Sequence, residues 1–194
     1  DRDKKRIYIL SFSWSFQIVF IGLLGLLLGS TSADTNISVD NDNNSQGGTQ
    51  RVSINNDHNV ANVDNDNGWD GSWNSIWDFN NGFVATRIFA KKTCIVHKIN
   101  KNVVPSIQDF ERLSKNKPNV HTGPSPKSQR YMIDPQNIKD LAQFGTPIET
   151  MCKGLPTYKA QEVQGQSFLF FSGPCFSANI LLIFDISYCG ETIA

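Results

Sequence analysis

Histidine is scarce in this chain of 194 residues, which has only three copies, His58, His97 and His121. Their positions do not match the usual spacings of metal ligands. The sequence also lacks a glycine-framed serine, a phosphate-binding loop, an H-E-x-x-H helix and a dinucleotide fingerprint. We therefore expect no enzyme, no catalytic residue, no cofactor and no metal site. His97 alternates with apolar neighbours, so we interpret it as an ordinary strand residue.

An excess of either charge is also missing. The chain has 18 basic and 18 acidic residues, which gives a formal net charge of zero. Nucleic-acid-binding proteins usually present a basic surface to the phosphate backbone. The neutral composition gives no reason to expect a nucleic-acid partner.

Charged residues are absent between Arg6 and Asp34. Within this stretch a strongly apolar run, 18–28, is followed by small residues up to Ala33. A basic start, a short apolar run and small residues are typical of a secretory signal peptide, which residues 1–33 are predicted to form. The uncharged run that begins at Ile7 is also long enough to cross a bilayer, so an uncleaved signal-anchor remains an alternative.

Cysteine is limited to four residues, and no two of them form a C-x-x-C pair. They are Cys94, Cys152, Cys175 and Cys189. An even number of cysteines behind a secretory N-terminus predicts two disulfides. Four cysteines allow three pairings, and spacing alone does not choose among them.

Residues 34–66 are rich in asparagine, aspartate, serine and glycine, with only short alternating apolar pieces. We expect a polar N-terminal arm here, exposed to solvent. Asn36 and Asn43 each begin an N-glycosylation sequon and are candidate glycosylation sites.

Tryptophan is concentrated between Trp69 and Asn100, which hold three of the four copies. Three runs in this stretch are rich in aromatic and β-branched residues, and an Asn-Gly turn separates the first two. This pattern predicts a meander of three antiparallel strands, at 73–79, 83–89 and 93–99. Asp78 lies in the first strand between two aromatic residues. A carboxylate in such a place must be hydrogen-bonded, paired or uncharged.

The remaining segments predict two helices and a hairpin. Ser106 precedes an apolar stripe with helical spacing, which predicts a helix that Ser106 caps. Residues 115–130 are predicted to be a loop, and a second helix is expected over 135–144. Apolar runs at 168–171 and 180–184 predict a C-terminal β-hairpin, which is the part of the chain most prone to aggregate.

Five motifs in the chain resemble the BRICHOS domain, and specifically that of the gastrokines, the secreted stomach-mucosa members. The motifs are GWDGSWNSIWDF, GFVATRIF, KKTCIVHKIN, VVPSIQ and MCKGLPTY. In the BRICHOS pattern an aspartate precedes the first paired cysteine, as Asp78 precedes Cys94, and a second cysteine follows, as Cys152 does. The resemblance implies the pair Cys94–Cys152 and leaves Cys175–Cys189, which would also clamp the ends of the apolar hairpin.

The resemblance implies an α+β fold. We expect an antiparallel sheet of about five strands with flanking helices and the polar arm. The expected divisions are a signal peptide or anchor (1–33), a polar segment (34–66), the BRICHOS domain (67–160) and a C-terminal hairpin (161–194).

The resemblance also implies a function. We expect a secreted, extracellular protein that passes through the ER, the Golgi and secretory granules. It would maintain the gastric epithelium with growth-modulating, mitogenic activity, through an epithelial receptor. It would also bind β-prone or amyloidogenic segments as a chaperone does, and could form homo-oligomers. The alternative is a membrane-anchored type II proprotein that acts mainly as an intramolecular chaperone.

Asp78 has two interpretations at this stage. In the structural one, its carboxylate holds the sheet by accepting hydrogen bonds. In the other it senses pH, because protonation in an acidic lumen removes the charge and loosens the aromatic layer.

Overall fold

The computed structural model describes residues 34–41, 48–104, 106–116, 125–163 and 173–193, and residues 33–194 group into one compact unit. The predicted signal peptide, Asn43 and the apolar run 168–171 lie outside the described residues. No helix in the described part of the chain is both long and apolar enough to cross a membrane.

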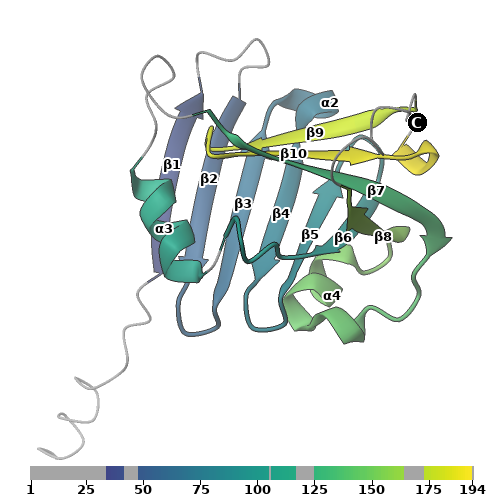
Figure 1. Cartoon of the computed structure of the whole chain (residues 1–194), viewed down its shortest axis with the longest axis horizontal. Helices are drawn as coiled ribbons and strands as arrows, with labels where there is room; N and C mark the ends of the chain where they lie inside the picture. The colour runs from purple at the N-terminus through teal and green to yellow at the C-terminus, as the bar shows by residue number, and fades with distance from the viewer. Residues whose placement is uncertain (1–33, 42–47, 105, 117–124, 164–172, 194) are drawn as a thin grey trace, which may run out of the picture. The chain divides into compact units, whose positions relative to one another are not determined.

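The described residues form a mixed sheet of ten strands in the order β1-β2-β3-β4-β5-β6-β8-β7-β10-β9 (Figure 1). The fold is therefore α+β, but its sheet is much larger than the expected five strands. The strands are β1 (Asp34–Asn41), β2 (Gly48–Asn55), β3 (Val60–Asp66), β4 (Trp73–Asp78), β5 (Phe83–Ile88), β6 (Thr93–Lys98), β7 (Lys127–Asn137), β8 (Thr157–Glu162), β9 (Cys175–Ile180) and β10 (Phe184–Cys189).

The expected polar arm is wrong for the described residues, because they form strands β1, β2 and β3 of the same sheet. Strands β2 and β3 each present one face to the core. Val52 and Ile54 of β2 and Ala61 and Val63 of β3 are buried, while polar residues alternate with them. Alternation with a period of two is the pattern of a strand with one buried face, and the polar composition concealed it. The sheet thus runs across the expected boundaries at 66/67 and 160/161.

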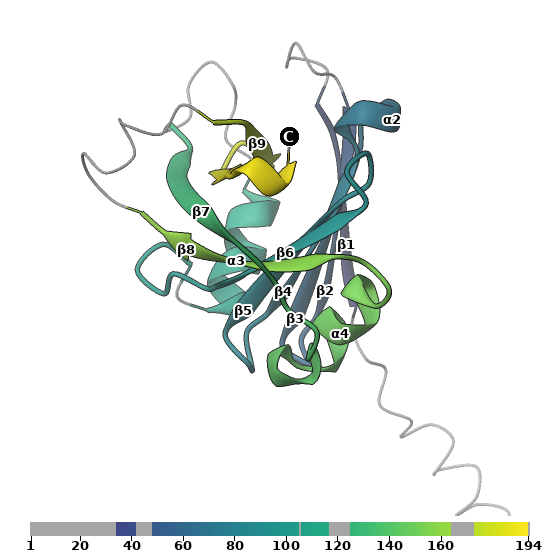
Figure 2. The same ribbon diagram turned by 90° about the vertical axis from the view of Figure 1, so that its right-hand side faces the viewer.

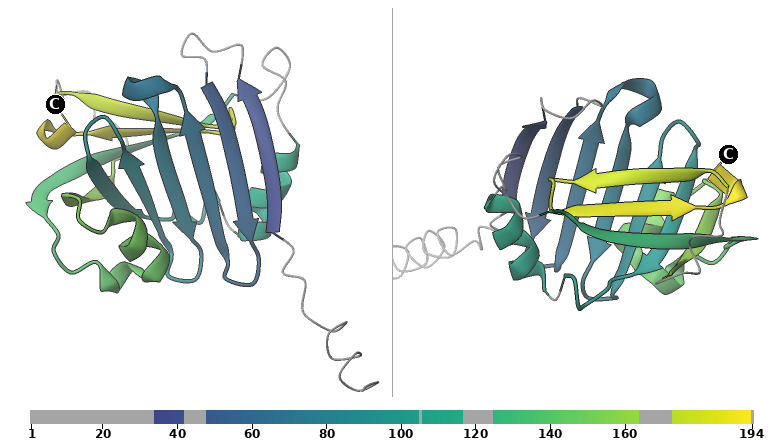
Figure 3. Two further views of the ribbon diagram at one scale, coloured as in Figure 1. Left: turned by 180° about the vertical axis from the view of Figure 1, so that it is seen from behind. Right: turned by 45° about the horizontal axis from the view of Figure 1, so that its top comes forward.

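Strands β1 to β6 form an antiparallel meander, and its strands β4, β5 and β6 are the ones that the sequence predicts. After β6 the order changes, because β8 pairs parallel to β6 and β10 pairs parallel to β7. Figure 2 and the right panel of Figure 3 show the consequence: β7, β10 and β9 cross over one face of the meander.

The main core lies between these two layers. The rings of Trp77 (β4), Phe110 and Phe184 (β10) meet there, with centroids 5.1 Å apart for Trp77 and Phe110 and 5.9 Å apart for Trp77 and Phe184. Phe110 belongs to helix α3 (Ile107–Lys115), which begins where it is predicted, because the Ser106 Oγ accepts a 3.0 Å hydrogen bond from the Asp109 backbone N–H. Burial of three aromatic rings makes this cluster a major source of stability.

A second, smaller core lies on the other face of the meander, as the left panel of Figure 3 shows, where helix α4 (Thr146–Cys152) packs. The other helical pieces are short: α2 (Gly68–Gly71), η1 (Ala142–Phe144) and η3 (Glu191–Ile193).

The helix expected over 135–144 is wrong. Strand β7 runs to Asn137, and only Ala142–Phe144 are helical, as a single 3-10 turn. Gln129, Tyr131 and Ile133 are buried while their neighbours are exposed or half-buried. This alternation begins inside the predicted loop, where prolines and basic residues obscured it.

The C-terminal hairpin exists, but its turn lies where a strand is expected. β9 and β10 are paired antiparallel, and the turn between them has Leu181 and Leu182 at φ +52° and +61°. Gln50 of β2 holds this turn: its Nε2 donates to the Asn179 carbonyl (2.5 Å), and its Oε1 accepts from the Leu181 N–H (2.8 Å). The apolar side chain of Leu181 is buried in the core, although the residue lies in a turn and not in a strand.

Candidate functional site

Two disulfides fix the ends of short elements. Cys94 of β6 is joined to Cys152 at the end of α4, and Cys175 of β9 is joined to Cys189 of β10. These are the pairs that the resemblance implies. Cys175 and Cys189 stand directly opposite each other in the ladder, so the second bridge closes the open end of the hairpin.

Asp78 is the last residue of β4 and is 1% exposed. Its Oδ1 accepts a 2.9 Å hydrogen bond from the Asn81 backbone N–H, and its Oδ2 accepts a 2.7 Å bond from the Asn81 Nδ2. The carboxylate therefore closes the β4–β5 turn. These contacts agree with the structural interpretation of Asp78, and the pH-sensing role stays a prediction.

Gly145 covers this turn and precedes α4. A Cβ at Gly145 would overlap the Asn81 Nδ2 and would lie 2.8 Å from the Asp78 Oδ2, and the φ of +94° also favours glycine. Helix α4 is therefore held at both ends, by the contact of Gly145 with Asp78 and Asn81 and by the bond of Cys152 to Cys94. The disulfide therefore keeps the C-terminal end of α4 beside β6.

A chain of buried polar side chains links four strands through the main core. His97 (β6) contacts the Tyr188 hydroxyl (β10) through Nε2 at 3.0 Å, Tyr188 contacts the Thr86 Oγ1 (β5) at 2.9 Å, and Thr86 contacts the Ser75 Oγ (β4) at 3.1 Å. The sequence does not predict this polar chain, because its members are far apart along the polypeptide. The only signal is that hydroxyl residues occupy inward positions of predicted strands.

His97 is neutral at ordinary pH. Its Nδ1 lies 2.9 Å from the Lys98 carbonyl oxygen, which can only accept, so Nδ1 carries the hydrogen and Nε2 accepts from Tyr188. Burial lowers the pKa of His97 from 6.5 to about 4, against a smaller opposing effect of the bond to Lys98. Burial also raises the pKa of the Tyr188 hydroxyl, which therefore stays protonated.

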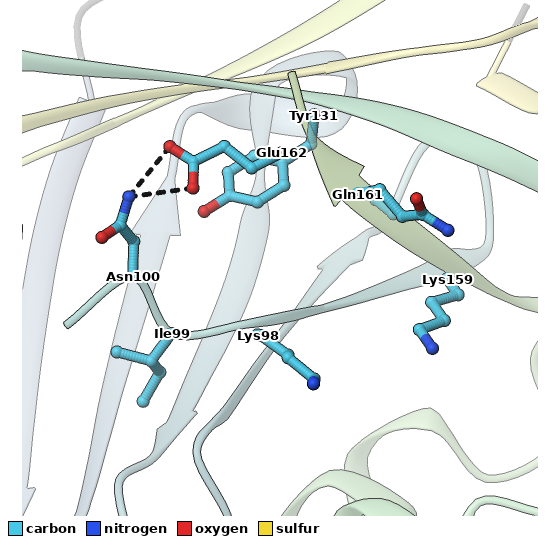
Figure 4. Close-up of a pocket in the computed structure, with 8 residues that line it drawn as sticks. Lys98, Ile99, Asn100, Tyr131, Lys159, Gln161 and Glu162 are labelled. Carbon is cyan, nitrogen blue, oxygen red and sulfur yellow. Dashed lines mark hydrogen bonds between the residues drawn. The ribbon is translucent and has the colours of Figure 1, made fainter. Parts of the chain in front are cut away.

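An opening of about 340 Å³ lies beyond the point where the pairing between β6 and β8 ends. The ladder between these strands pairs only Cys94 with Thr157, Ile95 with Tyr158 and Val96 with Lys159. Beyond it the opening is lined by Lys98, Ile99, Asn100, Tyr131, Lys159, Ala160, Gln161 and Glu162. Figure 4 shows that Asn100 and Glu162 bridge one end of the opening, where the Asn100 Nδ2 donates to both carboxylate oxygens at 2.8 and 2.9 Å.

This opening is the candidate functional site. It combines apolar side chains, two lysines and the edges of two strands, an arrangement suited to binding a peptide. Asp78 and the Cys94–Cys152 bridge support it indirectly, because they fix the meander and α4 beside β6. The candidate glycosylation residue Asn36 lies in β1, and its occupancy stays a prediction.

The family model of the BRICHOS domain matches residues 69–159, which contain Asp78, Cys94 and Cys152. The class of the domain is therefore BRICHOS. Gastrokine-1 of Homo sapiens is 55% identical over 182 residues, which cover 92% of this chain and 98% of the relative. Gastrokine-1 of Mus musculus is 47% identical and covers 89% and 95%, and Gastrokine-3 of Homo sapiens is 33% identical and covers 66% and 70%. The chain belongs to the gastrokine family. No solved structure matches it.

Proposed function

We propose that this chain is a secreted protein of the gastric mucosa whose BRICHOS domain binds β-prone peptide segments and keeps them from aggregating. The observation that carries the binding function is the opening between β6 and β8, where two strands of a fixed sheet part. Two disulfides support secretion, since such bonds persist in oxidising compartments outside the cytosol. The family membership supports the gastric location.

The mechanism is strand addition. An extended peptide that enters the opening can form backbone hydrogen bonds with the facing edges, which gives affinity with little dependence on sequence. A groove uncovered by a swing of α4 is a poorer explanation here, because the Cys94–Cys152 disulfide joins this helix to β6.

The chain's own hairpin is the first client in this proposal. Phe184, Ile186 and Tyr188 of β10 are buried, and β10 lies between β7 and β9. Its β-prone residues are therefore covered in the folded protein, and the same sheet can then act on other chains. Deletion of 168–189 would remove Phe184 and Tyr188 from the core, so the binding test needs the complete folded protein.

The test is a fibril-growth assay with the disulfide-bonded protein, expressed from the full chain and collected after secretion. At about one molecule per ten of an amyloid-forming peptide, the lag before fibril growth should lengthen. The control is the same protein after reduction and alkylation. Equal fibril growth with and without the native protein would contradict the chaperone role.

Growth modulation through an epithelial receptor is the second function that family membership supports. Its test is saturable binding of the purified protein to gastric epithelial cells, followed by a count of cell division. The intact mass of the secreted form separates a cleaved signal peptide from the membrane-anchored alternative and also reports any glycan on Asn36 or Asn43.

A further inference from the structure

The opening between β6 and β8 is lined by side chains from both faces of the sheet. Lys98 and Ile99 follow each other in the chain, as do the four residues from Lys159 to Glu162, and all of them line the same space. Consecutive residues of a strand point to opposite faces. The opening therefore lies between two strand edges and not on either face of the sheet. An occupant that fits such a space is thin and extended.

Both β6 and β8 stay extended beyond the last pair that they form with each other, because each is also paired with another strand. On β6, His97 and Lys98 remain paired with Val84 and Phe83 of β5. On β8, Ala160, Gln161 and Glu162 remain paired with β7, at Ile133, Met132 and Tyr131. The two facing edges thus stay extended but have no ladder partner in the described chain. Two such edges are ready to accept a further strand.

Among the described residues, two side chains span the far end of the opening. Asn100 and Glu162 form the bridge seen in Figure 4, and Glu162 is exposed. A hydrogen bond between exposed side chains adds little net stability, since water replaces it readily. An entering strand can therefore displace this bridge.

The two sides of the opening differ in chemistry. The side toward the main core is apolar, with Ile99, Ala160 and the ring of Tyr131, all of which belong to the main core. The other side carries Lys98 and Lys159, which are exposed, and among the described residues neither has an ion-pair partner. An occupant that satisfies both sides alternates apolar and acidic residues, because successive side chains of a strand point in opposite directions.

We infer that the opening binds an extended peptide segment in which acidic and apolar residues alternate. The acidic side chains face Lys98 and Lys159, the apolar ones face Tyr131 and Ala160, and the backbone pairs with the edges of β6 and β8. Glu162 follows Ala160 by two residues, so its carboxylate lies on the apolar side of the sheet and not on the lysine side that the acidic residues face. This inference rests on the proposed function and names the partner of its site.

The direct test uses a fluorescein-labelled heptapeptide of alternating valine and glutamate, with the folded, disulfide-bonded protein and fluorescence anisotropy as the readout. A matched peptide has lysine in place of each glutamate. The glutamate peptide should bind, the lysine peptide should bind much more weakly, and amide resonances of 98–100 and 159–162 should shift on binding. Equal affinity for both peptides, or shifts confined to other strands, would overturn the inference.

Charge reversal tests the lysines. The double variant Lys98→Glu, Lys159→Glu should weaken binding of the glutamate peptide by roughly tenfold or more, because like charges then meet at the site. The control Lys91→Glu, Lys139→Glu alters two exposed lysines elsewhere by the same net charge and should leave the affinity unchanged. An equal loss in both double variants would assign the effect to net charge and overturn the inference.

The fibril assay with the same variants separates the site from the function. If the native protein slows fibril growth and the Lys98→Glu, Lys159→Glu form slows it equally, the chaperone function holds and this opening is not its site. If the peptide binds through the lysines but fibril growth is unaffected, the site holds and the chaperone function fails.

Discussion

Gly145 lies against the carboxylate of Asp78 so closely that no side chain fits between them. This close contact places the start of α4 directly against the β4–β5 turn.

Replacement of Gly145 by alanine should destabilise the protein. The new Cβ would lie 2.8 Å from the Asp78 Oδ2, and alanine is also strained at φ +94°. We expect the free energy of unfolding to fall by about 2–3 kcal/mol in a urea titration. The matched control is Gly154→Ala, at φ +79° with no atom within 4 Å, which is subject to the backbone strain alone. Equal losses for the two variants would show that the contact with Asp78 is unimportant.

Replacement of Asp78 by asparagine should also destabilise the fold. The carboxylate accepts from two donors of Asn81, and an amide at this buried position offers only one accepting atom to them. A loss of about 1–3 kcal/mol is expected from denaturant unfolding, since one buried donor is left without a partner. The native protein and the Asp78→Asn variant also test the pH-sensing role. If oligomer size depends on pH in the same way in both proteins, Asp78 is not the pH sensor.

The stability of the fold should fall in mild acid because of His97. Its pKa is about 4 in the folded protein, whereas the ordinary pKa of a histidine side chain is 6.5. The unfolded chain therefore binds a proton between these values and the folded chain does not, so stability is complete above pH 6.5 and declines toward pH 4. The decline amounts to about 3 kcal/mol.

Variants of two histidines isolate this effect. His97→Gln should flatten the decline of unfolding free energy between pH 6.5 and pH 4, while His58→Gln, at an exposed position, should leave it unchanged. An unaltered pH profile in His97→Gln would contradict the assignment.

The two disulfides should differ in their contributions. They close loops with sequence separations of 58 and 14 residues. By the chain-entropy argument the longer loop gives about 4 kcal/mol and the shorter about 3 kcal/mol. The double variant Cys94→Ala, Cys152→Ala should thus be less stable than Cys175→Ala, Cys189→Ala in guanidinium titrations. It should also lose hydrogen-exchange protection in α4, which the other variant should keep.

The sequence was most informative where local pattern and tertiary environment agree. The meander that follows Trp73 and the cap at Ser106 were predictable, because turn residues and apolar spacing specify them locally. The disulfide pairs followed only from the family resemblance. The opening between β6 and β8 was not predictable, because it depends on parallel pairing between segments about sixty residues apart.

The predictions of a polar arm at 34–66 and of a loop at 115–130 failed for the same physical reason. The strands of 34–66 expose polar residues on one face, and β7 begins within a segment whose prolines and lysines indicate a loop. In each case the alternation of buried residues was present but outweighed by composition. Leu181 lies in a turn despite its local preference for a strand, because the Gln50 side chain accepts a hydrogen bond from its backbone N–H.

The placement of β10 has a consequence for biosynthesis. Phe184 packs on Trp77, so the inner surface of the meander lacks part of its cover until β10 has left the ribosome. A premature stop codon before this strand would remove the cover that Phe184 gives to the Trp77 ring. Cellular quality control should therefore retain such truncated products.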